Sequence, residues 1–336
     1  MGKGEDMRRT VLLPMSAAVV LAGAALAAPA NAAPGEAVFF VDPGQSGVSG
    51  LAKRDGNAKA TAFTSFRQVQ DVAKRRGVKH VRLLIVGGVH HLTEPIVWDY
   101  SPKGASVVFD TAPGTGRVVF DGSRMNTARA SRYPGETTCA TYLLCIKAGY
   151  GSFTISGKTF QNAPNGIRLK GNTNITITGN VFKNLSGSKG YGGIHTESSS
   201  GLKIKNNLFS KLRNSGKMHG IYLVRTSRST ISGNRFEYVT GDPVRVRVSS
   251  NNLVSGNKFY RSGSYATFSE WRDTTKGEGC GKGNVFSKNI YGNSYGNKKK
   301  SMILWGGKGS PPVWGKCSTP SIKNGGGNKY RTTKPW

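Results

Sequence analysis

Four copies of one 18-residue pattern follow one another between residues 165 and 259. Their closing Phe residues are spaced 27, 27 and 23 apart, yet the copies themselves align without a gap. A period of roughly 20–50 residues is typical of a solenoid, in which each repeat forms one turn of a spiral. The copies read NGIRLKGNTNITITGNVF (165–182), GGIHTESSSGLKIKNNLF (192–209), HGIYLVRTSRSTISGNRF (219–236) and DPVRVRVSSNNLVSGNKF (242–259).

Apolar and polar residues alternate within each copy, as in Ile167/Leu169 and Ile175/Ile177. This period of two predicts strands with one buried face, because a helix would space its apolar residues three and four apart. One copy alone cannot bury its apolar face. Copies stacked at the strand spacing of about 4.8 Å would share a thin, continuous core. The pattern therefore predicts a spiral of parallel strands.

An Asn stands two residues before each closing Phe, at Asn180, Asn207, Asn234 and Asn257. Stacking would align these four side chains in a column. Asn tolerates the left-handed backbone of a tight turn, and stacked amides can hydrogen-bond along the axis. We therefore interpret the column as structural.

The repeated I-x-I-x-x-N-x-F turn resembles that of the pectate lyase-like superfamily. The resemblance covers nearly the whole chain after residue 32, and it implies an all-β fold, a right-handed single-stranded parallel β-helix (solenoid). That fold is shared by lyases, hydrolases, epimerases, phage tailspikes and proteins without known catalysis. The fold alone therefore assigns no activity.

Residues 1–32 have the features of a secretory signal peptide. Arg8 and Arg9 precede an apolar run, and Ala30-Asn31-Ala32 matches a cleavage site. The apolar run is rich in Ala and interrupted by Pro14, which favours a cleaved signal over a retained transmembrane anchor. We expect a secreted, extracellular protein that has no membrane anchor after cleavage and is a monomer.

Residues 33–336 are predicted to form one β-helix domain, with the clearest repeats at 142–330. A less regular fifth copy ends at Phe160, and related segments continue beyond Phe259. The domain therefore contains roughly eight to ten coils, by the repeat count.

The first part of this domain, residues 33–77, is predicted to be its N-terminal cap. Phe66, Val69 and Val72 have helical spacing, and Gly77 follows as a helix-ending residue. A β-helix needs its open end covered, since exposed strand edges recruit other chains. We therefore assign this helix to the cap.

Four cysteines in a secreted chain favour disulfides over thiol chemistry. Three connectivities exist for four cysteines. Local pairing would join Cys139 to Cys145 and Cys280 to Cys317. No C-x-x-C spacing of a zinc site occurs.

Lys and Arg outnumber Asp and Glu by 48 to 17, for a formal net charge of +31. A charge of this size favours anionic partners. The signal peptide and the lack of a nucleic-acid-binding motif argue against DNA or RNA. An acidic polysaccharide is the expected partner, and teichoic-acid-like wall polymers and anionic membrane surfaces are alternatives. A further alternative is that the charge only confers solubility.

The outward positions of the first strand in each copy are rich in charged and aromatic residues. Stacking would place them in one strip with a row about every 5 Å, close to the length of one sugar. The resemblance points to the same face, because enzymes of that superfamily bind substrate along the outer face of the first sheet. The strip contains Arg168, Lys170, His195, Glu197, Tyr222, Arg245 and Arg247, with Arg225 and His219 nearby.

These residue types suit β-elimination of a uronate sugar. A base must remove a carbon-bound proton, and positive charge must stabilise the carboxylate that gains electron density. Ca²⁺ is the one cofactor that this chemistry leaves open, and no metal site is predicted. We assign catalytic roles to His195, Tyr222, Arg245 and His219, and substrate-binding roles to Arg168, Lys170, Glu197, Arg225 and Arg247.

Each assignment has a structural alternative. His195 and His219 would then be ordinary residues of the sheet, and Arg245 and Arg247 ligand contacts or solvated charges. Glu197 would neutralise a neighbouring arginine rather than bind Ca²⁺.

The sequence contains fewer of the residues that other activities of this fold require. Neither the R-x-P-x-x-R segment of pectate lyases nor the D-P-H-D segment of mannuronan epimerases occurs. Glycoside hydrolysis needs two nearby carboxyl groups, whereas the outward candidates Glu197, Asp242 and Glu270 fall on different coils. We therefore expect a polysaccharide lyase with a cationic groove. The alternatives are a non-catalytic polysaccharide- or wall-binding protein, and a hydrolase or epimerase.

Overall fold

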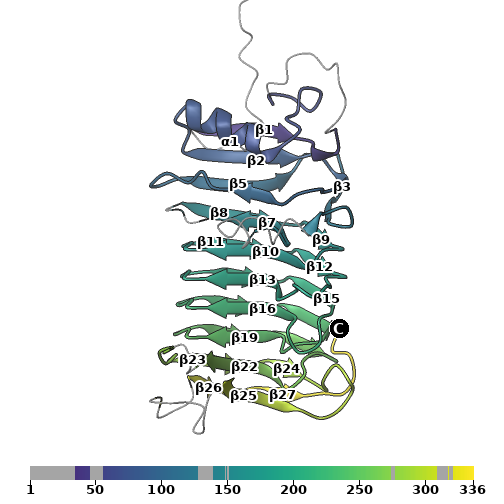
Figure 1. Ribbon diagram of the computed structural model, residues 1–336, viewed down its shortest axis with the longest axis vertical. Coiled ribbons are helices and arrows are strands. Elements are labelled where there is room, and N and C mark those ends of the chain that lie inside the picture. Colours follow the sequence, from purple (N-terminus) through teal and green to yellow (C-terminus); the bar gives the residue numbers. More distant parts are fainter. Residues whose placement is uncertain are drawn as a thin grey trace, which may run out of the picture.

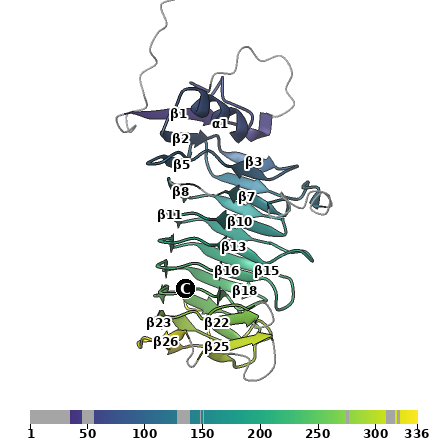
Figure 2. The ribbon, with the colours of Figure 1, turned by 60° about the vertical axis from the view of Figure 1, so that its left-hand side comes forward.

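Each coil of the chain contributes a strand to each of three parallel sheets, and the coils stack along one axis (Figure 1). The computed structural model describes residues 35–45, 56–127, 139–147, 149, 151–273, 277–308, 317 and 321–336. The expected signal peptide, residues 1–32, lies outside the described residues. The view in Figure 2 shows the same column of coils from a second side.

The first sheet has eight strands and carries the predicted functional strip. Its strands are β4 (Ile96–Trp98), β7 (Tyr142–Ile146), β10 (Asn165–Lys170), β13 (Gly192–Glu197), β16 (His219–Val224), β19 (Val244–Arg247), β22 (Ala266–Asp273) and β25 (Ser301–Lys308).

The second sheet has ten strands and follows the first in each coil. Its strands are β1 (Glu36–Val41), β2 (His80–Ile85), β5 (Ser106–Thr111), β8 (Ser152–Ser156), β11 (Ile175–Thr178), β14 (Lys203–Lys205), β17 (Thr230–Ser232), β20 (Leu253–Ser255), β23 (Asn284–Ser287) and β26 (Ile322–Asn324).

The third sheet has nine strands and closes each coil. Its strands are β3 (Gly88–His91), β6 (Val118–Asp121), β9 (Thr159–Gln161), β12 (Val181–Lys183), β15 (Leu208–Leu212), β18 (Arg235–Val239), β21 (Lys258–Tyr260), β24 (Ile290–Tyr291) and β27 (Lys329–Tyr330). The prediction of a parallel spiral is confirmed.

The core is a set of columns in which the same residue type repeats from coil to coil. The phenylalanines that close the copies form a continuous stack, with neighbouring ring centroids 4.7–5.1 Å apart and planes within 11° of parallel. This distance matches the strand spacing, so the rings pack without leaving the register of the sheets. The stack comprises Phe160, Phe182, Phe209, Phe236 and Phe259.

A buried ladder of asparagines runs beside the Phe stack. The Oδ1 of Asn207 accepts hydrogen bonds from the backbone N (2.9 Å) and Nδ2 (3.1 Å) of Asn180, and its own Nδ2 donates to Ile177 O (2.9 Å) and Asn234 Oδ1 (3.0 Å). The same bonds continue through Asn257 and on to later coils. The predicted column is confirmed.

The expected reason for these asparagines was partly wrong. The left-handed backbone lies one residue earlier, at Gly179, Asn206, Gly233 and Gly256 (φ between 54° and 67°). The ladder residues are selected for their amide hydrogen bonds, because Gly already supplies the turn at three of these four positions.

The N-terminal end is covered by helix α1 (Phe66–Arg75), which follows the short 3-10 helix η1 (Pro43–Gln45) (Figure 1). Ser65 and Gln68 form a capping box at its start, and Gly77 has φ of 63° just after its end. Phe66 packs on Phe109 of the first coils, with ring centroids 5.7 Å apart. The predicted capping helix is confirmed.

Both expected disulfides are present, Cys139–Cys145 and Cys280–Cys317. No helix among the described residues has the length and apolar character that crossing a membrane requires.

We expect Asn207→Ala to lower the free energy of unfolding by about 3 kcal/mol, since it removes several buried hydrogen bonds worth about 1 kcal/mol each and leaves the buried backbone N of Asn180 without its acceptor. Urea unfolding followed by circular dichroism measures this loss. Thr176→Ala, on the solvent face of the second sheet, is the control and should change stability by less than about 0.5 kcal/mol. Equal effects of the two substitutions would show that the ladder contributes no special stability.

Candidate functional site

The outward residues of the first sheet form the predicted strip. Strand pairing places Arg168, His195, Tyr222, Arg245 and Ser269 next to one another on successive coils. A second column, two residues further along each strand, contains Lys170, Glu197, Val224 and Arg247. We call these two columns the polar strip.

The middle of the polar strip is hollowed into an open cleft of about 360 Å³. The cleft is polar at both ends and aromatic in the centre, where His195 and Tyr222 lie. Lys170, Arg245 and His219 do not line it. Its lining is Arg168, Tyr191, His195, Glu197, Tyr222, Val224, Arg225, Arg247 and Glu278.

His195 stands at the centre of the cleft between two tyrosines. Its Nδ1 lies 2.6 Å from the hydroxyl of Tyr142, and its ring stacks on Tyr222 with centroids 4.9 Å apart. Burial and the neighbouring Arg168 guanidinium hold the pKa of His195 well below its usual value. The imidazole is therefore neutral at pH 7.

The sequence did not reveal Tyr142 as part of the site. It belongs to β7, two coils from His195, and its register partner on β10 is Asn165. Its side chain reaches across the intervening coil, so no spacing along the chain predicts the contact. Burial raises the pKa of Tyr142, so its phenol stays protonated.

Glu197 joins two arginines at one end of the cleft. Its Oε2 accepts a hydrogen bond from Arg168, and its Oε1 lies 2.5 Å from Nη2 of Arg225. Burial raises the pKa of Glu197, but Arg168 and Arg225 outweigh burial and lower it overall. The alternative in which Glu197 neutralises its neighbours is therefore the observed arrangement.

The residues present do not fit a Ca²⁺ site at Glu197. Calcium requires several oxygen ligands with lone pairs directed at one point, whereas both carboxylate oxygens of Glu197 already face guanidinium groups. Within the described part of the chain, no group of three or more His, Cys, Asp or Glu side chains is arranged to hold a metal ion.

The other strip arginines are paired in the same way. Arg245 binds Asp242 (Nη2–Oδ2 2.7 Å) and lies over the ring of Trp271. Arg247 binds Glu278 (Nη2–Oε1 2.6 Å). The sequence did not predict Glu278 as a site residue, because Glu278 lies on a loop after β22, outside the repeated pattern. The groove is therefore much less cationic than the charge of the whole chain suggested.

His219 lies beneath the polar strip rather than on it. It is 2 % exposed, its Nδ1 lies 2.8 Å from the backbone O of Asp242, and its ring contacts Tyr222. Asp242 is fully buried and accepts hydrogen bonds from the backbone N of Tyr265 and Ala266. His219 therefore has no direct access to a polymer on the strip.

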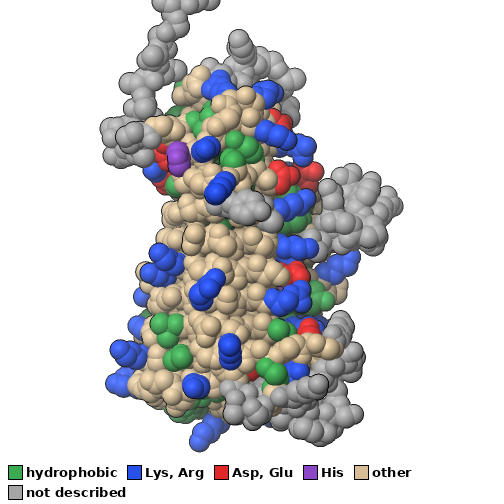
Figure 3. Space-filling model, turned by 90° about the vertical axis from the view of Figure 1, so that its left-hand side faces the viewer, with side chains coloured by type: hydrophobic (Ala, Val, Ile, Leu, Met, Phe, Trp, Pro, Cys, Tyr) green, Lys and Arg blue, Asp and Glu red, His purple; other side chains and the backbone are tan. Residues whose placement is uncertain are grey.

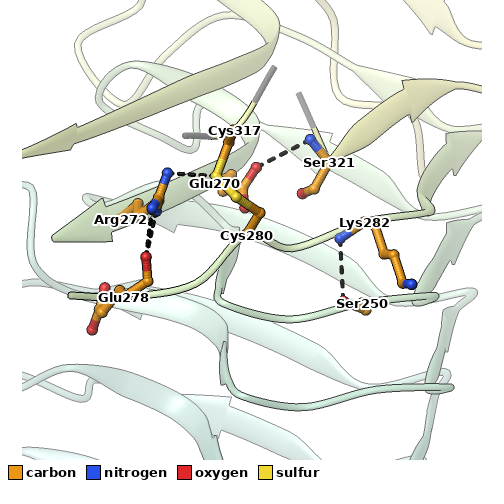
Figure 4. The surroundings of a disulfide bond; sticks show 8 residues. All are labelled: Ser250, Glu270, Arg272, Glu278, Cys280, Lys282, Cys317 and Ser321. Atoms are coloured by element: carbon orange, nitrogen blue, oxygen red, sulfur yellow. Dashed lines mark hydrogen bonds between the residues drawn. A yellow bond between two sulfur atoms is a disulfide. The ribbon is translucent and has the colours of Figure 1, made fainter. Parts of the chain in front are cut away.

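The expectation that Glu270 faces outward was wrong. Glu270 follows the outward Ser269 on β22, so the alternation of the strand turns it inward, in register with the buried Val246. Its Oε2 accepts a hydrogen bond from Ser321 N (Figure 4), and burial raises its pKa. A pair of carboxyl groups for glycoside hydrolysis is therefore not formed by Glu197, Asp242 and Glu270.

Basic side chains are widely spread outside the strip. In the middle of the face in Figure 3, Lys and Arg lie singly among other side chains and backbone, whereas along its right-hand edge they follow one another with acidic side chains between them. For example, Lys203 on β14 lies between Thr176 on the preceding coil and Thr230 on the following coil. This distribution matches the expectation for a charge that maintains solubility or diffuse adhesion.

Residues 144–312, half of the chain, match the sequence model of a protein family. The family is described as "right handed beta helix region". The chain belongs to this β-helix family. The match spans the coils that carry the polar strip, and it establishes the right-handed fold that the repeats predicted.

Solved β-helix structures resemble the chain at low identity. An alginate lyase from Paenibacillus sp. str. FPU-7 is 14 % identical with a TM-score of 0.42, covering 71 % of this chain and 95 % of that one. A family 28 exopolygalacturonase from Yersinia enterocolitica is 13 % identical (TM-score 0.42; coverage 88 % and 65 %). The tailspike of Acinetobacter baumannii phage AM24 is 12 % identical (TM-score 0.36; coverage 87 % and 52 %). No curated protein sequence matches.

We expect acid to destabilise this β-helix through its buried imidazoles. The pKa of His219 is lowered by burial and by Arg245, and that of His195 is also lowered. The unfolded chain, in which histidine titrates near 6.5, therefore binds more protons below that pH. The free energy of unfolding should fall as pH drops from 7 to 5, by up to about 1.4 kcal/mol per pH unit for each histidine.

Urea unfolding of His219→Asn at pH 7 and pH 5 tests this effect. The variant should show a smaller loss between the two pH values than the wild type, whatever its absolute stability. His80→Asn, at an exposed position, should retain the wild-type dependence. An unchanged dependence in His219→Asn would mean that His219 has the same pKa in the folded and the unfolded protein.

Proposed function

We propose that this protein is a secreted polysaccharide lyase that cleaves a uronate-containing chain by β-elimination on the polar strip. The observation that carries the proposal is the neutral His195 stacked on Tyr222 inside the cleft, with arginine side chains on both sides. The two disulfides are consistent with an oxidising, extracellular compartment.

His195 is the base in this proposal. When its Nδ1–H donates to the Tyr142 hydroxyl, the lone pair of Nε2 is left to accept the proton from C5 of the uronate. The lowered pKa of His195 keeps this lone pair unprotonated at pH 7. The same shift weakens the base, so the arginines must stabilise the developing negative charge.

Arg225 is the best placed cation for the uronate carboxylate. Its side chain is 49 % exposed, compared with 6 % for Arg168 and 20 % for Arg247. A guanidinium beside the carboxylate stabilises the electron density that arrives when the C5 proton leaves. Arg168 lies under Glu197 and fixes its position instead.

Tyr222 is the acid in this proposal. Tyr222 lines the same cleft, and Arg247 is its neighbour there. As the C4–O4 bond breaks and a C4=C5 double bond forms, Tyr222 gives its proton to the departing O4. The proton held by His195 then returns to Tyr222 through solvent, which restores the starting state.

A non-catalytic binder of acidic wall polymers is the second candidate. It is favoured by basic side chains that lie away from the polar strip, such as Lys203 and Lys205 on the second sheet and the single Lys and Arg side chains in the middle of the face in Figure 3. Such a surface attracts a polyanion without any particular cleft.

Polygalacturonate, alginate and glycosaminoglycans are the substrates for testing the lyase. Cleavage should raise ultraviolet absorbance from the unsaturated uronate, and His195→Ala and Tyr222→Phe should each lower kcat by at least about 100-fold. Thr176→Ala should leave kcat unchanged. New reducing ends without absorbance would indicate a hydrolase, and binding without either signal would indicate the non-catalytic alternative.

The pH dependence of kcat/KM gives a second test, because it reports the base of the free enzyme. With the pKa of His195 lowered by burial, activity should not fall as pH is reduced from 7 to 6. The decline should begin only at more acidic pH. A half-maximal rate near pH 6.5 would show that an ordinary, solvated histidine is the base.

A further inference from the structure

Glu278 brings a negative charge to the polar strip from outside the sheet. Its carboxylate accepts a hydrogen bond from Nε of Arg247 (2.8 Å) and forms an ion pair with Nη2 of the same side chain (2.6 Å). Glu278 also lines the cleft beside Tyr222. The planar edge of a guanidinium is the part that binds a carboxylate in two-point fashion. Glu278 therefore occupies the edge of Arg247 that a uronate carboxylate would need.

Several contacts hold Glu278 in this position. The guanidinium of Arg272 donates to its backbone O (Nε–O 2.9 Å), and the backbone N of Asp273 donates to its Oε2 (2.8 Å). Two residues further on, Cys280 is bonded to Cys317 (Figure 4). The side chain is only 10 % exposed. A polymer would therefore meet Glu278 as a fixed part of the cleft.

The arginine charges of the strip are partly neutralised as a result, and Lys170, which lies outside the cleft, adds one further positive charge. Each arginine of the strip or its rim has a carboxylate partner: Glu197 for Arg168 and Arg225, Asp242 for Arg245, and Glu278 for Arg247. Of the described arginines that line the cleft, Arg225 alone has a half-exposed side chain. Among the described residues, Arg225 is thus the most accessible cation of the cleft. Glu197 lies on the coil before it, and the loop after β22 places Glu278 beside Arg247 on the coil after it.

We propose that Glu278 makes the cleft select polymers in which uronates are separated by uncharged sugars. This inference rests on the proposed function, because it assumes that the polar strip binds a uronate chain. Coils are about 4.8 Å apart, so sugars on either side of the one at Arg225 lie near Glu197 or Glu278. A carboxylate on each of these sugars would face a like charge, which opposes binding of a homopolymer.

Two forms of one polymer test the proposal: polygalacturonate, and the same chain with about half of its carboxylates methyl-esterified. Dissociation constants are measured by calorimetry in the His195→Ala background, so that cleavage does not alter the polymer. The half-esterified chain should bind about tenfold more tightly, as expected for one like-charge contact near the surface. Glu278→Gln should remove most of that difference.

Glu237→Gln is the matched control, because Glu237 also pairs with a basic side chain (Lys334, 2.6 Å) but lies on the third sheet. It should keep the tenfold preference. Raising the salt concentration to 1 M should shrink the preference in the parent protein, since charge repulsion is screened.

Three results would overturn the proposal: equal or tighter binding of unesterified polygalacturonate, no binding of either form, or an unchanged preference in a folded Glu278→Gln protein. If Glu278→Gln does not fold, the preference of the parent protein for the half-esterified chain decides the question. Lyase activity is read separately from absorbance. A protein that binds with the expected preference but never cleaves would disprove the lyase while leaving the role of Glu278 standing.

Discussion

Hydrogen bonding between neighbouring coils is the constraint on which the rest of this molecule depends. Each coil is too short to form a core of its own, so its backbone groups and its apolar side chains find partners only on the coils before and after it. The Asn ladder and the Phe stack repeat this dependence at the side-chain level. The same register that aligns the buried columns also aligns the outward residues, which makes the polar strip a by-product of how the core is built.

Much of this architecture follows from the sequence because alternation is a local property. The period of two identifies inward and outward residues, and the gap-free alignment of the copies shows which residues lie next to one another on successive coils. The outward residues Arg168, His195, Tyr222 and Arg245 could therefore be placed side by side from the sequence. Glu270 was misplaced because the alternation was not continued strictly into β22. The backbone turn was assigned to the ladder Asn, although the adjacent Gly performs that role.

What the sequence could not provide is the set of contacts that cross coils or come from loops. Tyr142 reaches His195 over an intervening coil, and Glu278 arrives from a segment that follows no repeat. Formal charge was also a poor guide to the strip. A net charge of +31 describes the whole chain, whereas the strip pairs its arginines with carboxylates, which depends on side-chain geometry rather than composition.

The unequal spacing of the closing Phe residues has a wider consequence. The copies keep their 18 residues, and the shorter third interval is absorbed between a closing Phe and the next copy, at 237–241 compared with 183–191 and 210–218. These segments contain the end of a third-sheet strand and the corner that leads to the first sheet. That corner borders the polar strip, yet its length changes without disturbing the rows. Segments grafted at this edge would therefore adjoin the polar strip while the scaffold stays intact, so the surface beside the strip can change without any change in the core.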